Sequence, residues 1–235
     1  MNDLIFEVRR SLIELDSGLK GDLSITEPME LIMYALADGK VPMKWEKLAW
    51  ASRDPLSAWI ANLLLRQGQL LTWTGDLAQP KVTWVAYLFN AQAFENAVKQ
   101  VTSRKNDWPL NKLVTIVDVT KKMSPEEVDV QTRDGAYVFG LFMEGARWDS
   151  GAGCLEDAFM KDLYPKMPVI LMKAILAEKE DRRGVYLCPV YKQTERATPG
   201  TATPGSGFVF MMQLKTKQPA AKWTMAGVAM LLAID

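Results

Sequence analysis

Apolar residues in the N-terminal part of the chain recur every three or four positions, the spacing that places side chains on one face of an α-helix. The first of these stripes predicts a helix that begins at the N-terminus and ends at Gly18 or Gly21. Its pattern is complete from the first turn, so we expect a helix cut from a longer one and a sequence that is the C-terminal piece of a larger protein. The stripe consists of Leu4, Ile5, Val8, Leu12, Leu15 and Leu19.

Capping signals mark where further helices begin. The clearest is Asp54-Pro55, an N-cap carboxylate followed by a proline that suits the first helical position, and it predicts a helix over residues 55–71. Similar signals predict a helix over residues 26–39, a short helix from Pro42 and a helix over residues 91–104. The tryptophans on these helices favour a bundle core over a ligand site.

After Trp108 the apolar spacing changes to every second residue, which is typical of β-strands. Six such runs favour an antiparallel barrel or sandwich, and Pro189 inside one of them indicates an edge strand or a bulge. The longest interruption, residues 151–166, is expected to hold a helical turn around residues 156–163. The predicted strands are residues 112–120, 135–144, 168–176, 184–191, 207–214 and 225–234.

The predicted fold class is therefore α+β: an N-terminal α-helical bundle followed by a mostly antiparallel six-stranded β-barrel. We place the helical subdomain at residues 1–107 and the barrel subdomain at residues 108–235, with the boundary where the period changes. A chain of 235 residues buries roughly 70 to 75% of its unfolded surface, which is enough for one large core or two smaller ones.

The charge composition of the sequence indicates no particular partner. Lys plus Arg and Asp plus Glu number 28 each, so no net field favours nucleic acid or an anionic membrane. No apolar stretch approaches the ~20 residues of a membrane span, and the N-terminus does not resemble a signal peptide. Cys154 and Cys188 lack metal-ligand spacing, and we interpret them as reduced, mostly buried thiols of an intracellular, soluble protein.

Histidine does not occur in the sequence, which removes Ser-His-Asp triads, His-Glu-x-x-His zinc sites and imidazole proton shuttles. The Gly-x-x-x-x-Gly-Lys-Ser/Thr run of a P-loop is missing too, and the Pro/Gly-rich residues 198–207 predict a hairpin loop instead. Carboxylates cluster at Glu126-Glu127, Glu156-Asp157 and residues 178–181, each in a stretch expected to be a solvated loop. We predict no catalytic residue, no cofactor-binding residue and no metal ligand in this segment.

Residues 134–149 form the most informative stretch of the sequence. They read Asp-Gly-Ala-Tyr-Val-Phe-Gly-Leu-Phe-Met-Glu-Gly-Ala-Arg-Trp-Asp, a strand-like alternation that can bend at Gly145 before its last three residues. We expect Arg147 to lock a barrel corner, either by stacking on Trp148 or by pairing with Asp149.

This stretch resembles a signature of the C-terminal segment of dynein heavy chains. Other stretches match that family in the same order, so the resemblance covers nearly the whole sequence. The Glu-Gly-Ala-Arg-Trp-Asp and Cys-Pro-Val-Tyr-Lys runs are more similar to axonemal than to cytoplasmic dyneins. The other matching stretches are Leu19-Lys20-Gly21, Asp38 to Pro42 with Trp45, Pro55-Leu56, Trp84 with Gln92-Ala93-Phe94, Leu163, Pro165 to Ile170, Tyr186 to Lys192 and Trp223 to Leu232.

The resemblance implies a segment without an active site that lies against one face of a ring of six AAA+ modules. Its implied role is to brace the ring and to modulate how ATP hydrolysis becomes minus-end-directed stepping along microtubules. ATP and Mg are then bound by AAA+ modules elsewhere in the heavy chain, a microtubule-stimulated ATPase. The implied partner is the ring of the same heavy chain, with microtubules contacted only indirectly, no nucleic acid and no membrane. The implied location is the cytoplasm and cytoskeleton and, for an axonemal type, the axoneme of a cilium or flagellum.

Exposed charges are the candidates for the surface that contacts the ring, although ordinary solvation is the simpler interpretation of each. They comprise charges on the first helix and two basic pairs in loops. The residues are Glu7, Arg9, Arg10, Glu14, Lys121-Lys122 and Arg182-Arg183.

Two other classes of function stay open. A stand-alone barrel that binds oligonucleotides needs basic residues among its aromatics, which Phe208 and Phe210 lack, and an enzyme with carboxylate chemistry needs acids in an apolar pocket. A stand-alone binding or scaffold module has the same composition as a motor segment. The shared order of the motifs is what separates these two interpretations.

Overall fold

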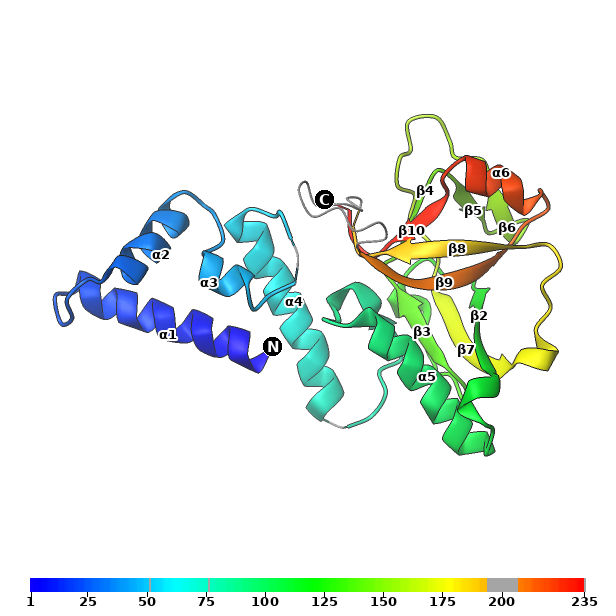
Figure 1. Ribbon diagram of the computed structural model, residues 1–235, viewed down its shortest axis with the longest axis horizontal. Coiled ribbons are helices and arrows are strands. Elements are labelled where there is room, and N and C mark those ends of the chain that lie inside the picture. Colours follow the sequence, from blue (N-terminus) through cyan, green and yellow to red (C-terminus); the bar gives the residue numbers. More distant parts are fainter. Residues whose placement is uncertain (51, 76, 194–206, 235) are drawn as a thin grey trace. The chain divides into compact units, whose positions relative to one another are not determined.

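A computed structural model describes residues 1–50, 52–75, 77–193 and 207–234 (Figure 1). The described residues divide into two compact units, residues 1–74 and residues 75–234, and each is considered separately below. The first unit is helical, and the second combines one long helix with several β-sheets. The predicted α+β class is confirmed.

In the described part of the helical unit lie α1 (Asn2–Leu19), α2 (Glu27–Ala37), α3 (Met43–Glu46) and α4 (Leu56–Gly75). The starts of these helices confirm the capping signals. Thr26 is the N-cap of α2, with proline in the first turn, and α4 follows Asp54-Pro55 directly. Beyond the end of α1, Gly21 takes the left-handed conformation (φ 84°) that commonly terminates a helix.

Stacked aromatic rings form the core of the helical unit. The Trp59 ring stacks on Trp45, with 6.0 Å between centroids, and on Trp50, with 5.2 Å between centroids. Leu4 of α1 and Leu63 of α4 belong to the same buried cluster. The core role predicted for the tryptophans is confirmed for Trp45 and Trp59, which are almost fully buried.

The buried face of α1 differs from the predicted stripe. Ser11 and Gly18 are buried, whereas Leu12 and Leu19 of the stripe are exposed. Small residues take the inward positions because neighbouring side chains approach closely. A Cβ added at Gly18 would lie 2.6 Å from Cε of Met29 in α2, so only glycine fits there without a shift of that side chain.

The strands of the second unit are β1 (Val82–Trp84), β2 (Leu113–Val119), β3 (Ala136–Phe139), β4 (Phe142–Glu144), β5 (Arg147–Asp149), β6 (Cys154–Glu156), β7 (Ile170–Leu176), β8 (Val185–Tyr191), β9 (Phe208–Lys215) and β10 (Ala229–Leu231). They form one sheet of order β1-β3-β7-β2, a second of order β4-β10-β8-β9, and the pair β5-β6. The pairs β1–β3 and β8–β10 are parallel, and the other pairs are antiparallel.

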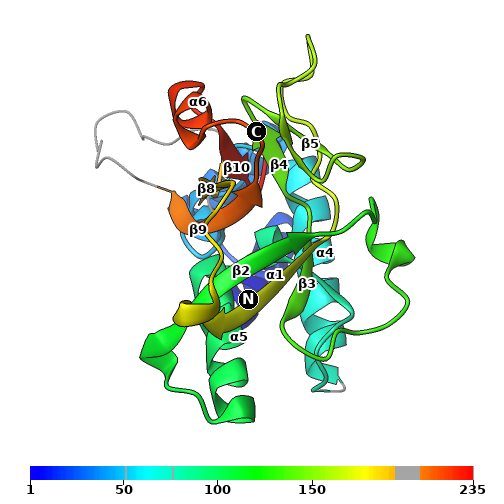
Figure 2. The same ribbon diagram turned by 90° about the vertical axis from the view of Figure 1, so that its right-hand side faces the viewer.

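Each predicted strand region contains a strand, but the region 135–144 contains two. The backbone bends at Gly140, whose φ is 82° and where an added Cβ would lie 2.1 Å from Nε1 of Trp84. The bend sends β3 into the first sheet and β4 into the second. The end strands β2 and β9 lie side by side without a hydrogen-bonded ladder between them (Figure 2). The described strands therefore form no closed barrel, and the six-stranded β-barrel is not confirmed.

Two local predictions are wrong. Residues directly after Pro219 form helix α6 (Ala220–Met225). The predicted strand region 225–234 therefore begins with the last residue of a helix rather than with a strand. Residues 156–163 do not form a helical turn; they leave β6 as irregular backbone and turns. The hairpin loop predicted at residues 198–207 lies outside the described residues except for Gly207.

Pro189 lies in β8, which has neighbours on both sides, so the predicted edge position is wrong. Proline is tolerated there because the ladder between β8 and β10 begins one residue later, at Val190. The register between β8 and β9 shifts between Val190 and Tyr191, which agrees with the alternative prediction of a bulge.

Helix α5 (Ala91–Asn106) belongs to the second unit, because it lies against β2, β7 and β9. Asn90 caps it by accepting a hydrogen bond from the backbone N–H of Ala93 at 3.1 Å. The predicted boundary between residues 107 and 108 marks the place where the spacing of apolar residues changes. That residues 1–107 and 108–235 are separate folding units stays a prediction. Short 3-10 helices complete the unit: η1 (Val85–Tyr87), η2 (Leu110–Lys112), η3 (Pro125–Glu127) and η4 (Ala177–Lys179).

Candidate interaction surfaces

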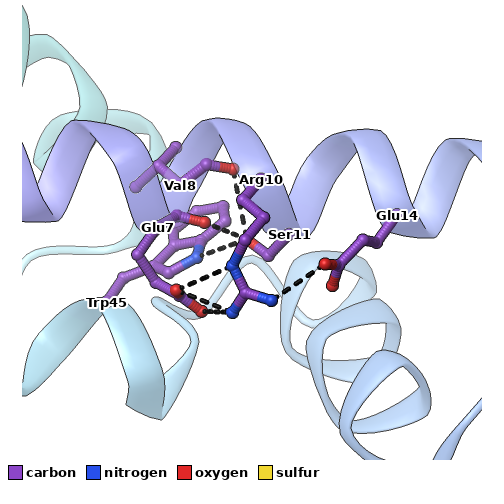
Figure 3. Close-up of polar contacts among 6 residues, drawn as sticks. All are labelled: Glu7, Val8, Arg10, Ser11, Glu14 and Trp45. Carbon is purple, nitrogen blue, oxygen red and sulfur yellow. Dashed lines mark hydrogen bonds and ion pairs between the residues drawn. The ribbon is translucent and has the colours of Figure 1, made fainter.

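The charged residues predicted as a contact surface on α1 form ion pairs with one another along the helix (Figure 3). Arg10 Nη2 and Nε lie 2.8 and 3.2 Å from Oε2 of Glu7, and Arg10 Nη1 lies 2.8 Å from Oε1 of Glu14. The spacings of three and four positions place these side chains on one face. Hydrogen bonding to Glu7 raises the pKa of Arg10 above its ordinary value. Arg9 and Arg10 are exposed, Glu7 and Glu14 are half-buried, and Arg10 is paired with both carboxylates, as is typical of a solvated helix surface.

A buried hydrogen bond fixes the inward face of α1. Trp45 Nε1 donates to Oγ of Ser11 at 3.0 Å, and that hydroxyl donates to the backbone oxygen of Glu7 at 2.7 Å (Figure 3). The indole N–H therefore has its partner inside the core, where an unpaired donor would be costly. Because this contact joins α1 to α3, it sets the rotation of α1 about its axis and thus which side chains face outward.

The outward side of α1 carries large apolar residues as well as charges. Phe6 and Ile13 are 67% and 55% exposed, and their spacing of two helical turns places them on one side of the helix. Leu12 and Leu19 are exposed too. Sequence periodicity places these two leucines in the core, so it misses this surface. An apolar stripe on a fixed helix is a candidate protein contact.

Arg147 of the signature stretch does not use Trp148 as its aromatic partner. Its guanidinium carbon lies 4.2 Å from the ring centroid of Phe159, in the loop after β6, and Nη1 lies 3.8 Å from Oδ2 of Asp149. Asp149 accepts hydrogen bonds from the backbone N–H groups of Ala152 and Gly151, which lower the pKa of its carboxyl. The stretch thus closes a turn and supports the loop that contains Phe159.

The basic pairs Lys121-Lys122 and Arg182-Arg183 lie on exposed loops. Lys122 Nζ donates to the backbone oxygen of Glu127 at 2.6 Å, and Arg183 Nε lies 2.9 Å from Oδ1 of Asp181. The hydrogen bond from Arg183 lowers the pKa of Asp181 to about 2. Both contacts are local to their loops, so neither pair indicates a partner.

Glu180 departs from the prediction of a solvated loop, because its side chain is only 5% exposed. Arg182 Nη2 lies 2.8 Å from Oε2 of Glu180, and Nε2 of Gln213 donates to the other carboxylate oxygen. The hydrogen bond from Arg182 is the main cause of a lowered pKa at Glu180. The prediction is wrong here because Gln213 stands on β9, 33 positions further along the sequence, and covers the loop.

Glu180 and Glu95 of α5 line a cavity of about 340 Å³ between α5, β2 and β9. Glu95 accepts hydrogen bonds from Oγ1 of Thr115 at 2.8 Å and from Nε2 of Gln92 at 3.0 Å, and Lys99 Nζ lies 2.6 Å from its Oε1. Each carboxylate has a basic partner and further donors, so the cavity contains satisfied polar groups rather than a poised acid and base. The helical spacing around Glu95 and the loop-like composition around Glu180 gave no signal that these two residues line one cavity.

Cys154 and Cys188 are buried free thiols, and burial raises the pKa of Cys188. A buried thiol of this kind is a poor nucleophile. Among the described residues, no three or more Cys, Asp or Glu side chains are placed to hold a metal ion. Nor does a helix in that part of the protein have the length and apolar character to cross a membrane.

Comparison with known proteins matches residues 1–232 to a family described as the C-terminal domain of dynein heavy chains. Similar proteins include the dynein beta chain of the flagellar outer arm of Chlamydomonas reinhardtii (47% identical), the ciliary dynein beta chain of Heliocidaris crassispina (49%) and dynein axonemal heavy chain 9 of Homo sapiens (47%). Each alignment spans 234 residues, which is 100% of this protein and 5% of the relative.

Proposed function

Because the protein belongs to the family of C-terminal domains of dynein heavy chains, we propose that it packs on the AAA+ motor ring of its own heavy chain and modulates ATP-driven, minus-end-directed motility along microtubules. The observation that carries the proposal is the match along the entire sequence to axonemal heavy chains at nearly half of all positions. A stand-alone scaffold module gives no reason for that match.

The proposed role needs no active site in this segment. Its buried carboxylates, Glu95 and Glu180, are held by basic neighbours and amide donors, and burial raises the pKa of the Cys188 thiol. ATP and Mg are bound, in this proposal, by the AAA+ modules of the parent heavy chain, which is the microtubule-stimulated ATPase. The domain contacts microtubules only through the rest of the motor.

We propose α1 as the contact through which the helical unit meets the ring. Phe6 and Ile13 supply exposed apolar area, and the hydrogen bond between Trp45 and Ser11 holds the helix in the rotation that presents them. A rigid body that touches the ring shifts the ring's conformational balance only if it binds one arrangement better than another. If α1 binds one nucleotide state of the ring better than another, the domain changes how ATP hydrolysis is coupled to movement. It does so without catalysing a reaction itself.

The relatives named above are flagellar, ciliary and axonemal proteins. We therefore place the parent motor in the axoneme of a cilium or flagellum, where its stepping would drive beating. The finer description of the second unit as a barrel belongs to this proposal too, since each predicted strand region contains a strand and the end strands β2 and β9 of the two sheets lie side by side in the described residues.

The test compares the parent motor with a truncated variant that lacks residues 1–235 and with a Phe6→Ser, Ile13→Ser double variant. We expect microtubule-stimulated ATPase to survive while run length or stall force changes several-fold, because the domain acts on coupling rather than on hydrolysis. The matched control is Leu31→Ser, which removes an exposed leucine from α2, and it should leave run length and stall force unchanged.

Loss of ATPase on truncation would instead make the domain chiefly a brace for the ring. If truncation changes neither ATPase nor motility, the proposal is wrong and the scaffold alternative takes its place. If truncation acts but the double variant does not, the contact lies elsewhere than on α1.

A further inference from the structure

The second unit carries an exposed apolar surface that no role discussed so far uses. Phe159, Met160 and Leu163 lie on the loop after β6, where Met160 is 91% exposed, and Met225 at the end of α6 is 88% exposed. Single exposed apolar residues are ordinary, but three within one short loop are not. Phe159, Met160, Leu163 and Met225 are called the loop patch below.

Two contacts fix the loop patch to the sheets and to α6. The ring of Phe159 lies against the guanidinium of Arg147 in β5, 4.2 Å from its central carbon. Asp157, at the start of the loop, pairs with Lys222 of α6 at 2.7 Å, which holds the helix that carries Met225 next to the loop. The backbone of a surface fixed in this way loses little conformational entropy when a partner covers it.

The loop is also fixed where it ends, and it contains a strained residue. The backbone N–H of Met143 donates to the oxygen of Pro165, and that of Met167 donates to the oxygen of Leu141, both at 2.9 Å. Lys161, at the centre of the loop, has a φ of 74°, which a residue with a side chain seldom adopts. Local preference alone would not keep this exposed shape, and such strain is common where a segment serves a contact.

Charge around the loop patch favours a protein partner. Lys161, Lys166 and Lys222 stand beside Asp157 and Asp162, so the loop and α6 have an excess of one basic residue, too little to favour an anionic membrane or a nucleic acid. Two of the four apolar side chains are methionines, whose unbranched thioethers repack against surfaces of different shape. The chemistry fits an apolar protein surface whose shape changes.

The size of the loop patch indicates where that partner is. Four side chains offer on the order of 400 Å², about half of the ~800 Å² per partner in a stable interface between separate proteins. A contact this small holds only when the partner is tethered and its effective concentration is high. The heavy chain is such a partner, since this segment amounts to 5% of the length of each relative.

We propose that the loop patch docks on an apolar surface of its own heavy chain outside this domain, as a second contact separate from α1. The flexible methionines keep that contact in place while the opposing surface changes during the ATPase cycle. This inference rests on the proposed function, and it goes beyond it by naming a contact surface on the second unit.

The test places a photo-crosslinking amino acid in the full-length motor at position 160 or 163, and in parallel at Phe6 of α1. Val130 is the matched control, because it is an exposed apolar residue of the same unit outside the loop patch. All four positions are exposed, so the substitutions should not disturb folding. After irradiation, mass spectrometry identifies the crosslinked peptides.

We expect positions 160 and 163 to crosslink to other parts of the same heavy chain with a yield at least about fivefold above position 130. If Phe6 crosslinks while positions 160 and 163 give no more than position 130, the loop patch is not a contact and the proposed function still stands. If Phe6 also gives no crosslink, the contact proposed for α1 fails as well. Crosslinks from 160 or 163 to a different polypeptide overturn the tethered partner inferred here.

Discussion

The indole of Trp84 packs so closely against the backbone at Gly140 that the two residues together decide the path of the polypeptide. Trp84 stacks on Tyr87, with 4.4 Å between ring centroids, and meets Phe139 edge to face at 5.4 Å. The aromatic group leaves no space for a side chain at Gly140, which has a positive φ. One residue without a Cβ therefore allows a single predicted strand to be divided between two sheets.

Gly140→Ala should destabilise the protein by at least about 2 kcal/mol, because the methyl group meets the Trp84 ring and the backbone leaves its preferred region. Chemical denaturation measures the free energy of unfolding. The matched control is Gly68→Ala in the middle of α4, where an added Cβ meets nothing within 4 Å. That change should stabilise by about 0.5 to 1 kcal/mol, since alanine is the better helix former. Equal effects of the two substitutions would refute this account of the bend.

At the scale of elements, side chains tie the ends of strands to neighbours that are distant in sequence. Tyr186 in β8 donates its hydroxyl proton to the backbone oxygen of Val228 at 2.7 Å, just before β10 begins. In the same way, the hydrogen bond between Thr115 and Glu95 ties β2 to α5. Each bond satisfies a buried polar group and aligns two elements, so both packing and polar pairing set the geometry.

Tyr186 gives the stability of this strand end a defined pH dependence. Burial raises the pKa of Tyr186 from its ordinary value of 10 to about 12, so the fold favours the neutral phenol. The stabilisation is therefore fully present below pH 10 and is lost as the pH rises through about 12. Tyr186→Phe should cost about 1 kcal/mol at pH 7 and progressively less in the alkaline range.

Denaturant titrations of the natural protein and of Tyr186→Phe at several pH values between neutral and strongly alkaline measure this difference. Tyr34→Phe is the control, because Tyr34 is exposed and its substitution should not change the free energy of unfolding at any pH. A difference between the natural protein and Tyr186→Phe that stays constant up to the highest pH would contradict the assigned role of the hydroxyl.

At the scale of the whole molecule, the contact surfaces proposed above lie on separate compact units. The helical unit offers α1, with Phe6 and Ile13, and the second unit offers the loop patch, with Met160. In the function proposed above, a domain with these two surfaces acts on a motor ring through differential contact with the ring's conformations.

Fragments of the protein can test whether helix α5 belongs to the folding unit that contains the sheets. Because α5 buries Phe94 and Val98 in this unit and its Glu95 in a polar network, we expect a fragment of residues 75–235 to unfold cooperatively. A fragment of residues 108–235 lacks that helix and should be much less stable, since apolar area of the sheets is then exposed. Circular dichroism during thermal unfolding compares the two. Equal stability would support the boundary that the change of period predicts.

The sequence by itself determined the features that depend on neighbouring residues. Helix starts at Thr26 and Asp54-Pro55, the presence of a strand within each predicted region after Trp108 and the burial of the two thiols are confirmed. Caps, prolines and apolar periodicity act over a few positions, so they can be read without knowing the fold. The family was recognisable too, because its motifs keep their order along the sequence.

Only the tertiary structure decided what depends on residues far apart in sequence. The division of the region 135–144 follows from Trp84, the burial of Glu180 from Gln213, and the aromatic partner of Arg147 is Phe159 rather than its neighbour Trp148. The exposure of Leu12 and Leu19 on α1 is of the same kind, because a helical pattern says which residues share a face but not which of them a neighbouring element covers. Contacts of this sort form when distant segments pack together, and local patterns carry no record of which segments those are.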